Sequence, residues 1–420
     1  MFVVGYNKYH GDGNGHRMTT GLRSEAVRRS NLSVVLSRLH LSGSASRSDL
    51  VAATGLNRSA VGALVGDLVR HGLAAEVRAT PDGTPGRPSP VVQPASGRNA
   101  VLAIEVLVDT LAVAAYGLGG ATLAMRRIDR PRMVASPAAV VADIGALVRD
   151  VMAALPAHCV VHGAGVAVAG IVRRSDNTVV LAPNLGWRET PLGALLAAVL
   201  PTGLPIAVAN EGDLGALAEN TRGAAAGMAN MLYVSGEVGV GGGIISGGRA
   251  MTSASGFAGE IGHIPVNLDG SRCNCGATGC WETEVGEEAL LRRAGLAPDG
   301  GRAAFDAVCA AAAAGEPRTL VALEAHGRWL GLGLATLINV LDPELVVMGG
   351  IFGRLHPYVV GAIEGELGAR VLPVLRAAVH VVPSRLAEDA ALVGASELAW
   401  AGLLADPAGV APLGILAGSI

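Results

Sequence analysis

The sequence predicts an α/β protein in two parts, a short basic helical module followed by a longer body of alternating strands and helices. Residues 1–98 carry 12 Lys/Arg against 6 Asp/Glu, whereas the remaining residues carry 20 against 29. Apolar residues recur at helical spacing in the first part. From Arg98 onward, apolar runs of strand length alternate with helical patterns. Half of the 420 residues are apolar, which is ample for two or three domains.

The basic part begins with three expected helices. Apolar spacing places the first helix over about 31–42. Ser46 followed by Asp49 forms a capping box at the start of a second helix over 47–54. Asn57 is expected to cap a third helix, which ends at His71-Gly72. Residues 1–20 have no periodicity and are expected to form a disordered arm.

Two short strands, Leu73–Val77 and Ser89–Val92, are predicted to follow the third helix around a Pro/Gly-rich tip over Thr80–Arg87. The order helix, helix, short turn, helix and hairpin is that of a winged helix-turn-helix, predicted over residues 21–97. Its positive charge indicates a polyanionic partner, double-stranded DNA. The expected DNA-contacting residues are Asn57, Arg58, Ser59 and Gly62 on the third helix, Arg47 on the second, and Arg87 in the wing. The alternative is an accessory helical domain with solvated arginines.

The longer body reads as an α/β unit over residues 98–405. Its expected strands are Ala100–Leu107, Leu111–Gly117, Ala121–Ile128, Val160–Ala169, Ile206–Ala209, Met231–Ser235, Gly239–Ser246 and Leu345–Met348. Its expected helices are Pro137–Ala154, 211–222, 318–341 and 388–403. The apolar tail over 406–420 has no predicted structure or role.

The stretch from Gly259 to Glu282 carries one histidine and three of the five cysteines. Four N/S ligands are what a closed tetrahedral zinc site needs, and Gly276 and Gly279 allow tight turns. The predicted metal ligands are His263, Cys273, Cys275 and Cys280. The alternative is three core cysteines with an incidental histidine.

This segment resembles the signature of the ROK family, named for repressors, open reading frames and kinases. The family pattern is Glu-x-x-His before Cys-x-Cys-Gly-x-x-Gly-Cys-x-Glu, and Glu260, His263 and Glu282 match it together with the three cysteines. The resemblance implies a two-lobed ribonuclease-H-like fold, as in actin and sugar kinases. It implies lobes over about 98–220 and 221–387, with the last helix, 388–403, returning to the first lobe.

The resemblance also implies a sugar pocket shaped by structural zinc. The sugar-binding residues that it implies are Asn184, Asn210, Glu211, Gly256, Glu260, His263 and Glu282. Two of these have alternative roles: Asn184 as a turn former before Gly186, and Glu260 as an ion-pair partner beside the zinc. His263 is expected to face both the zinc and the sugar.

The family's kinases use an aspartate as catalytic base, and Glu211 stands at that position here. Their first phosphate loop is rich in glycine, whereas Leu107, Val108 and Asp109 occupy the corresponding positions. Glu237 and Val238 replace a Gly-Thr pair in the second loop. These departures predict that catalysis is lost and that neither ATP nor Mg²⁺ is bound.

The expected function is therefore a sugar-responsive, DNA-binding transcriptional regulator, a repressor of carbohydrate-utilisation genes. Its expected partners are operator DNA and a small sugar, and its expected state is a homodimer or homotetramer. Five cysteines without a signal peptide favour the cytoplasm, with no membrane association. Two alternatives stay open: a sugar kinase fused to a DNA-binding domain, and a regulator controlled by a protein partner.

Overall fold

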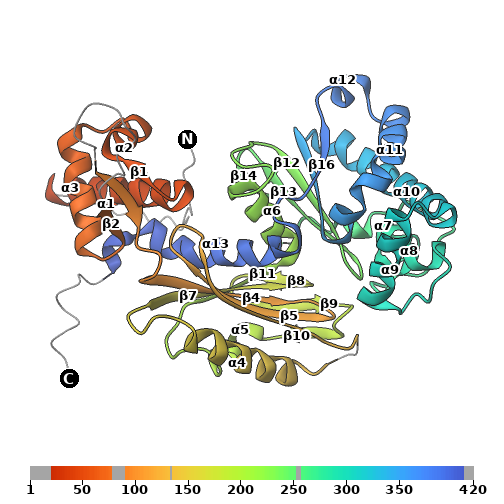
Figure 1. The fold of residues 1–420 in the computed structure, drawn as a ribbon, viewed down its shortest axis with the longest axis horizontal. Coiled ribbons are helices and arrows are strands. Elements are labelled where there is room, and N and C mark those ends of the chain that lie inside the picture. Colours follow the sequence, from red (N-terminus) through yellow and green to blue (C-terminus); the bar gives the residue numbers. More distant parts are fainter. Residues whose placement is uncertain (1–19, 78–89, 133–134, 252–256, 411–420) are drawn as a thin grey trace, which may run out of the picture.

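The molecule consists of a small helical module and two sheet-based lobes arranged along one long axis (Figure 1). The computed structural model describes residues 20–77, 90–132, 135–251 and 257–410. The helical module packs against the first lobe at one end, and the second lobe lies at the other end. One helix, α13 (Ala390–Ala405), runs from the second lobe along the first lobe to the helical module.

The amino-terminal module is a winged helix. Its elements are α1 (Thr20–Ser42), β1 (Ala45–Ser46), α2 (Arg47–Thr54), α3 (Arg58–Arg70), β2 (Ala74–Val77) and β3 (Val91–Pro94), and its strand order is β1-β3-β2. The predicted capping box is confirmed, because the Ser46 hydroxyl accepts from the Asp49 N–H and the Asp49 carboxylate accepts from the Ser46 N–H. Asn57 caps α3 by accepting from the Ala60 N–H.

Helix α1 begins at Thr20 rather than near residue 31, so the predicted start was wrong and the expected arm over 1–20 reaches one residue into the helix. The stretch 25–30 is exposed, which explains why no apolar stripe marked it. The expected second wing strand is Val91–Pro94 rather than Ser89–Val92. The wing tip over Thr80–Arg87 lies outside the described residues.

The first lobe is built on a five-stranded sheet in the order β11-β7-β4-β5-β6. Its strands are β4 (Asn99–Val106), β5 (Thr110–Gly117), β6 (Thr122–Asp129), β7 (Val160–Val168) and β11 (Ile206–Asn210). Helices α4 (Pro137–Ala153) and α5 (Leu192–Ala197) cover one face, and α13 covers the other (Figure 1). Strands β4 and β5 are buried along their whole length because both faces are covered.

A small antiparallel sheet extends the first lobe toward the second. It consists of β8 (Ile171–Arg173), β9 (Thr178–Ala182) and β10 (Trp187–Thr190), in the order β10-β9-β8. The sequence analysis did not predict these strands. They matter for function because β8 starts directly after β7 and contacts β11, so that it lies beside the first turn of α6 (Glu211–Thr221).

The second lobe holds another five-stranded sheet in the order β14-β13-β12-β15-β16. Its strands are β12 (Met231–Gly236), β13 (Val240–Ser246), β14 (Arg249–Ala250), β15 (Leu345–Gly349) and β16 (His380–Pro383). Its helices are α7 (Trp281–Val285), α8 (Glu287–Arg293), α9 (Gly301–Ala313), α10 (Pro317–Leu341), α11 (Gly350–Arg370) and α12 (Pro373–Arg376). The described residues also form three short 3-10 turns: η1 (Ile261–His263), η2 (Ala387–Asp389) and η3 (Pro407–Gly409), the last packed against α1. Helix α6 packs against β12 and β13 and also against α13, so it lies between the two lobes.

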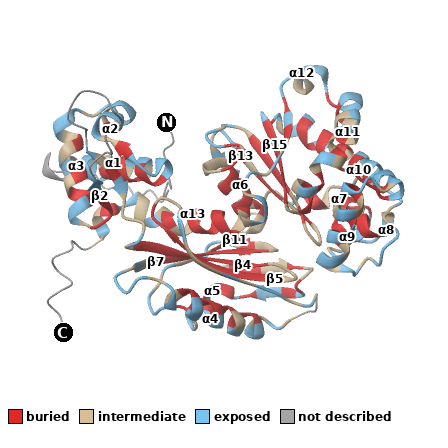
Figure 2. Ribbon diagram, viewed as in Figure 1, coloured by how far each residue is buried: buried red, intermediate tan, exposed pale blue. Residues whose placement is uncertain are grey.

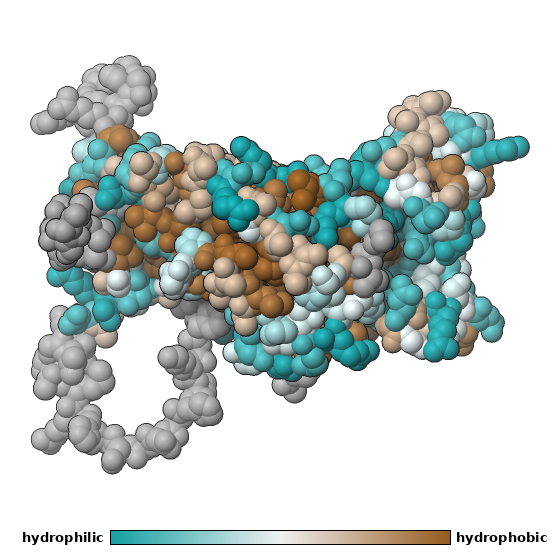
Figure 3. Space-filling model, turned by 90° about the horizontal axis from the view of Figure 1, so that it is seen from below, coloured by the Kyte–Doolittle hydropathy of each residue, from teal (hydrophilic) through white to brown (hydrophobic). Residues whose placement is uncertain are grey.

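Buried residues follow the sheets and the helix faces turned toward them (Figure 2). The face of the first lobe seen from below is rich in apolar residues (Figure 3). On this side α4 exposes several alanines between few charged residues: Ala138, Ala139, Ala142 and Ala146. Within the described residues, no helix is both long and apolar enough to span a membrane.

Candidate functional site

The four predicted metal ligands converge in the second lobe. Their ligand atoms all lie within 4.8 Å of one another. His263 ends the 3-10 turn η1, and its Nδ1 lies 3.7 Å from the Sγ of Cys273. The Sγ atoms of Cys275 and Cys280 are also 3.7 Å apart. One imidazole and three thiols at this separation suit a tetrahedral zinc ion.

The local backbone explains how ligands so close in sequence can surround one point. Gly276 and Gly279 have φ values of 99° and 71°, a left-handed conformation that other residues adopt only with strain. The Gly279 position has no room for a side chain, since a Cβ there would lie 1.6 Å from the Asn267 carbonyl oxygen. Burial raises the pKa of the Cys273 and Cys280 thiols. Zinc, when bound, would therefore supply the charge that stabilises their thiolates.

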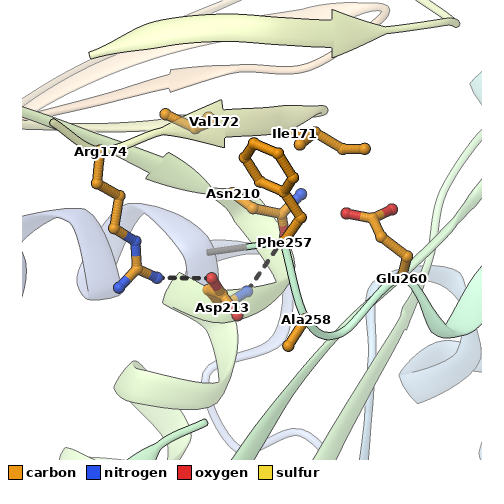
Figure 4. Close-up of a pocket in the computed structure, with 8 residues that line it drawn as sticks. All are labelled: Ile171, Val172, Arg174, Asn210, Asp213, Phe257, Ala258 and Glu260. Atoms are coloured by element: carbon orange, nitrogen blue, oxygen red, sulfur yellow. Dashed lines mark hydrogen bonds and ion pairs between the residues drawn. The ribbon is translucent and has the colours of Figure 1, made fainter. Parts of the chain in front are cut away.

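A pocket lies between the two lobes (Figure 4), and one of its lining residues, Glu260, faces the predicted metal ligand His263. It is lined by Ile171, Val172, Arg174, Asn210, Asp213, Phe257, Ala258 and Glu260. The first lobe contributes β8 with the residue after it and the start of α6. The second lobe contributes the loop 257–260. Because both lobes supply its walls, a ligand in this pocket would contact both.

Asn210 and Asp213 hold the pocket side of α6 in place. Asn210 caps α6: its Oδ1 accepts from the N–H groups of Gly212 and Asp213, at 2.7 and 3.3 Å. Its Nδ2 donates to the Gly170 carbonyl, at 3.0 Å. Asp213 accepts from Arg174, with Oδ2 2.7 Å from the guanidinium (Figure 4). The Asn210 amide therefore positions the helix, and only its second amino hydrogen is left for a ligand.

Two further carboxyl groups lie at this end of α6. Burial raises the pKa of Glu211 to about 8, and the nearby carboxylates of Glu260 and Asp213 add to the rise. The Glu211 Oε2 atom is buried and has no hydrogen-bond partner within the described chain. Burial also raises the pKa of Glu260, although His263 opposes the rise. A protonated Glu211 can donate a hydrogen bond as well as accept one, which a ligand hydroxyl needs.

His263 and Glu282 join the metal cluster to the pocket. The Nδ1 atom of His263 faces Cys273, whereas its Nε2 atom lies 4.0 Å from Glu260 Oε2. Glu282 Oε1 lies 3.7 Å from His263 Nδ1, and its Oε2 accepts from the Val240 N–H at 3.4 Å. The expected double role of His263, with one nitrogen toward the metal and one toward the pocket, is thus compatible with the structure.

Asn184 lies in the turn between β9 and β10, where its Oδ1 accepts from Asn274 at 3.1 Å. Gly186 in the same turn has a φ of 69°, as a turn-forming role requires. A Cβ built at Gly239 would lie 2.5 Å from Glu282 Oε2 and 3.1 Å from Asn184 Nδ2, which brings Asn184 to the Glu282 side of the site. Gly256 lies outside the described residues.

Six of the eight pocket-lining residues were not predicted from the sequence, among them Arg174, Asp213 and Phe257. Arg174 and Asp213 are 39 positions apart, and their pairing depends on how β8 meets α6. One sequence signal pointed to Asp213: it lies in the Asn210–Asp213 stretch, which resembles a sugar-binding motif of the ROK family. Phe257 is one of four phenylalanines in the chain and lies three residues before Glu260, a position that could have suggested a sugar-stacking ring.

Acidic side chains lie between the lobes on the side where the resemblance places nucleotide phosphates. Burial raises the pKa of Glu105 to about 7 and that of Glu237 to about 8, the latter helped by the Glu105 and Asp109 charges. Asp109 accepts two hydrogen bonds from Arg132, at 2.8 and 3.0 Å. Arg132 also pairs with Glu287 of α8, so it links the two lobes. A triphosphate at this place would meet carboxyl groups. Arg132, the cation that could bind its phosphates, is already paired with Asp109 and Glu287.

Five of the six predicted DNA-contacting residues lie on α2, on α3 or at the cap of α3 in the winged helix. Arg58 is exposed on the first turn of α3, and Gly62 lies one turn further along. Ser59 donates to Asn57 Oδ1 at 2.7 Å, so both side chains take part in the helix cap. Arg47 pairs with Glu76 of β2, with nitrogen–oxygen distances of 2.6 and 2.8 Å. Arg87 lies outside the described residues.

Fold and site together define a two-lobed α/β protein of the sugar-kinase type with an amino-terminal winged helix. The chain belongs to the ROK family, whose model matches residues 101–401. It is 27% identical over 381 residues to a xylose repressor of Bacillus spizizenii, covering 89% of this chain and 95% of the relative. It is 31% identical over 309 residues to a glucokinase of Streptomyces coelicolor, covering 67% of this chain and 95% of the relative.

Solved structures show the same two kinds of relative. A ROK family transcriptional regulator, described as a homologue of the Escherichia coli MLC protein, superposes with a TM-score of 0.72 at 26% identity, covering 90% of this chain and 97% of that one. A ROK family glucokinase from Streptomyces griseus, solved with glucose and AMPPNP, gives a TM-score of 0.64 at 27% identity, covering 71% and 99%. The predicted fold class and family are confirmed. The Bacillus spizizenii xylose repressor and the MLC-homologue structure cover 89% and 90% of this chain, which is more than the family-matched residues 101–401 alone.

Proposed function

We propose that this protein is a sugar-responsive transcriptional regulator, a repressor of carbohydrate-utilisation genes that acts in the cytoplasm. One observation carries the proposal: a winged helix is packed directly on the first lobe of a sugar-kinase-like body, with a pocket between the lobes of that body. The named relatives support it, since the xylose repressors match 89% of this chain.

The sugar binds in the interlobe pocket. Asn210, Glu211 and Glu260 supply hydrogen-bonding groups, with His263, Glu282 and Asn184 on the metal side. Zinc, when bound, would hold the loop 263–280 that carries His263, and it would take no part in chemistry. Sugar binding closes the lobes because each lobe supplies part of the pocket wall.

The DNA partner is double-stranded. Exposed Arg58 and the small residues Ser59 and Gly62 on α3 suit insertion into a major groove, with Arg47 and Arg87 near the phosphates. A homodimer would place two such helices about 34–36 Å apart on a two-fold symmetric operator. A change in that spacing on sugar binding lowers DNA affinity.

Phosphotransfer is lost in this proposal. The raised pKa of Glu211 leaves its carboxyl mostly protonated near neutral pH, which lowers the fraction of the protein with an ionised general base. Glu237 and the Asp109–Arg132–Glu287 pairs make the nucleotide side of the cleft unfavourable for a triphosphate. The glucokinase relatives keep one alternative open, a sugar kinase fused to a winged helix, and ATP turnover with any sugar in the screen below would favour it.

The test is a thermal-shift screen of zinc-loaded protein against D-xylose, D-glucose, other neutral sugars, amino sugars and sugar phosphates. A duplex selected from a random pool would serve as the DNA probe. A saturating sugar at a hundred times its Kd should stabilise the fold by about 2.7 kcal/mol and release the duplex. Intact DNA binding without any response to these sugars would favour control by a protein partner instead.

A further inference from the structure

Helix α6 connects the sugar pocket to the winged helix. Its first residues, Asn210 to Asp213, line the pocket or lie beside it. Its C-cap residue, Arg222, lies at the base of the winged helix and donates to the His40 carbonyl of α1, at 3.2 Å. A movement of the pocket end of α6 can therefore be transmitted to α1 through the contact of Arg222 with His40.

The helix has little freedom to absorb such a movement. A Cβ at Gly394 of α13 would lie 1.9 Å from the Leu214 carbonyl oxygen of α6. On the opposite side, a Cβ at Gly212 would lie 2.5 Å from the main chain of Gly242 in β13. Backbone packs on backbone at both places, with no flexible side chain between, so a displacement of β13 is passed through α6 to its contact with α13.

The C-cap of α6 and the middle of α13 meet α1 in a buried ionic cluster. Arg222 Nε donates to Glu397 Oε1 of α13, at 2.5 Å. Glu397 Oε2 lies 3.0 Å from Nε2 of His40, whose side chain is fully buried. His40 Nδ1 accepts from the Gly119 N–H, at 3.0 Å, so the β5–β6 turn is also tied to the cluster. Burial raises the pKa of Glu397, but His40 and Arg222 outweigh this and lower it overall.

We propose that Arg222, Glu397 and His40 are positioning residues that couple sugar occupancy of the pocket to the orientation of the winged helix. Breaking a buried pair leaves an uncompensated charge, so the cluster holds α1 to the C-cap of α6 and to the middle of α13 when these helices shift. The inference rests on the proposed function, because it needs a sugar and a DNA duplex that respond to each other.

The experiment measures the coupling factor, the ratio of duplex Kd values with and without saturating sugar, on full-length zinc-loaded protein. The sugar is the one that gives the largest thermal shift in a panel including D-xylose and D-glucose, and the duplex is selected from a random pool with wild-type protein. Coupling factors of about 5–150 are usual for allosteric proteins. Glu397→Gln should bring the factor close to 1 while sugar Kd and sugar-free duplex Kd stay within about threefold.

Two further variants keep the test decisive. If Glu397→Gln does not fold, the double variant Arg222→Met with Glu397→Leu replaces the ion pair by apolar groups, which proteins often tolerate. Ser33→Ala is the matched control, because Ser33 also joins α1 to α13, through the Leu404 carbonyl at 2.6 Å, but does not contact α6. It should retain wild-type coupling. Hydrogen exchange in α1 should respond to sugar in wild type and in Ser33→Ala only.

The outcomes separate the two ideas. Sugar-dependent DNA affinity in the wild type but not in the cluster variants would support the coupling role of the cluster. A purely structural role would lower stability without changing the coupling factor. Cluster variants with a wild-type coupling factor would overturn the coupling role of the cluster and leave the proposed function standing. A wild type without coupling would overturn both.

Discussion

The Cys273 thiol donates a hydrogen bond to Glu282, with Sγ 2.8 Å from Oε1. This contact joins the metal cluster to the sheet of the second lobe, because Glu282 also accepts from the Val240 N–H at the start of β13. The same carboxylate lies near His263, whose second nitrogen faces Glu260 in the pocket. Loss of metal should therefore change the pocket as well as the cysteine loop.

Metal removal should abolish sugar binding. Chelation removes the metal ion that holds the loop 263–280 together, and Cys275→Ser removes one of its ligands. Structural zinc contributes about 10–16 kcal/mol of apparent binding free energy. We expect a lower Tm, less than one zinc per chain by elemental analysis, and no thermal shift with sugar. Cys159→Ser is the control, since Cys159 lies outside the cluster. Normal sugar affinity in metal-free protein would contradict the structural role of zinc.

Arg58→Ala should weaken DNA binding and leave sugar binding unchanged. A base contact would cost about 1–3 kcal/mol and relax specificity at one position, whereas a phosphate contact would reduce the salt slope by about 1. Fluorescence anisotropy at several salt concentrations distinguishes the two. Arg328→Ala, on the exposed face of α10, is the matched charge control. Equal DNA affinity of Arg58→Ala and wild type would remove α3 from the interface.

Local patterns in the sequence were sufficient to predict the winged helix and most strands of the two lobes. Ser46 with Asp49 and Asn57 are helix caps whose signals lie within four residues of the helices they start. The start of α1 was missed because residues 25–30 are exposed and carry no apolar period. The small antiparallel sheet of β8, β9 and β10 was missed because its strands are only three to five residues long.

Predictions at the site depended on how far apart the interacting residues are in sequence. The metal ligands lie within one segment, so their spacing alone indicated them. The Arg174–Asp213 pair joins two segments and had no local signal. Gly241 to Gly243 follow the second phosphate loop in sequence, and in β13 they allow α6 to approach: a Cβ at Gly243 would lie 2.5 Å from the Gly212 carbonyl. Glycine for packing and glycine for phosphate binding are indistinguishable in sequence.

Glu211→Gln should stabilise the protein more at pH 8 than at pH 5. The folded pKa of Glu211 is about 8, against an ordinary value of 4.5. The unfolded chain therefore releases this proton first, and stability falls as pH rises between those values. Each pKa unit corresponds to about 1.4 kcal/mol, so the loss is on the order of a few kcal/mol.

The glutamine side chain does not ionise, so the Glu211→Gln variant does not lose stability in this way as pH rises. Urea unfolding of both proteins at pH 5, 6, 7 and 8 checks the prediction, with Glu324→Gln on the exposed face of α10 as the control. A difference between Glu211→Gln and wild type that stays constant across these pH values would mean that Glu211 is ionised in the fold.

The pocket should prefer uncharged sugars to sugar phosphates. Among its eight lining residues Arg174 is the one cation, and it is paired with Asp213 at 2.7 Å. Glu260 adds a second carboxylate, so a phosphate dianion would be repelled unless Arg174 left its partner. We expect a sugar 6-phosphate to bind at least about tenfold more weakly than the parent sugar, a difference of about 1.4 kcal/mol by calorimetry. Asp213→Asn should narrow this gap by freeing Arg174, whereas Arg173→Ala, at the adjacent residue outside the pocket lining, should leave it unchanged. A sugar phosphate that binds wild type as tightly as its parent would show that Arg174 serves the ligand rather than Asp213.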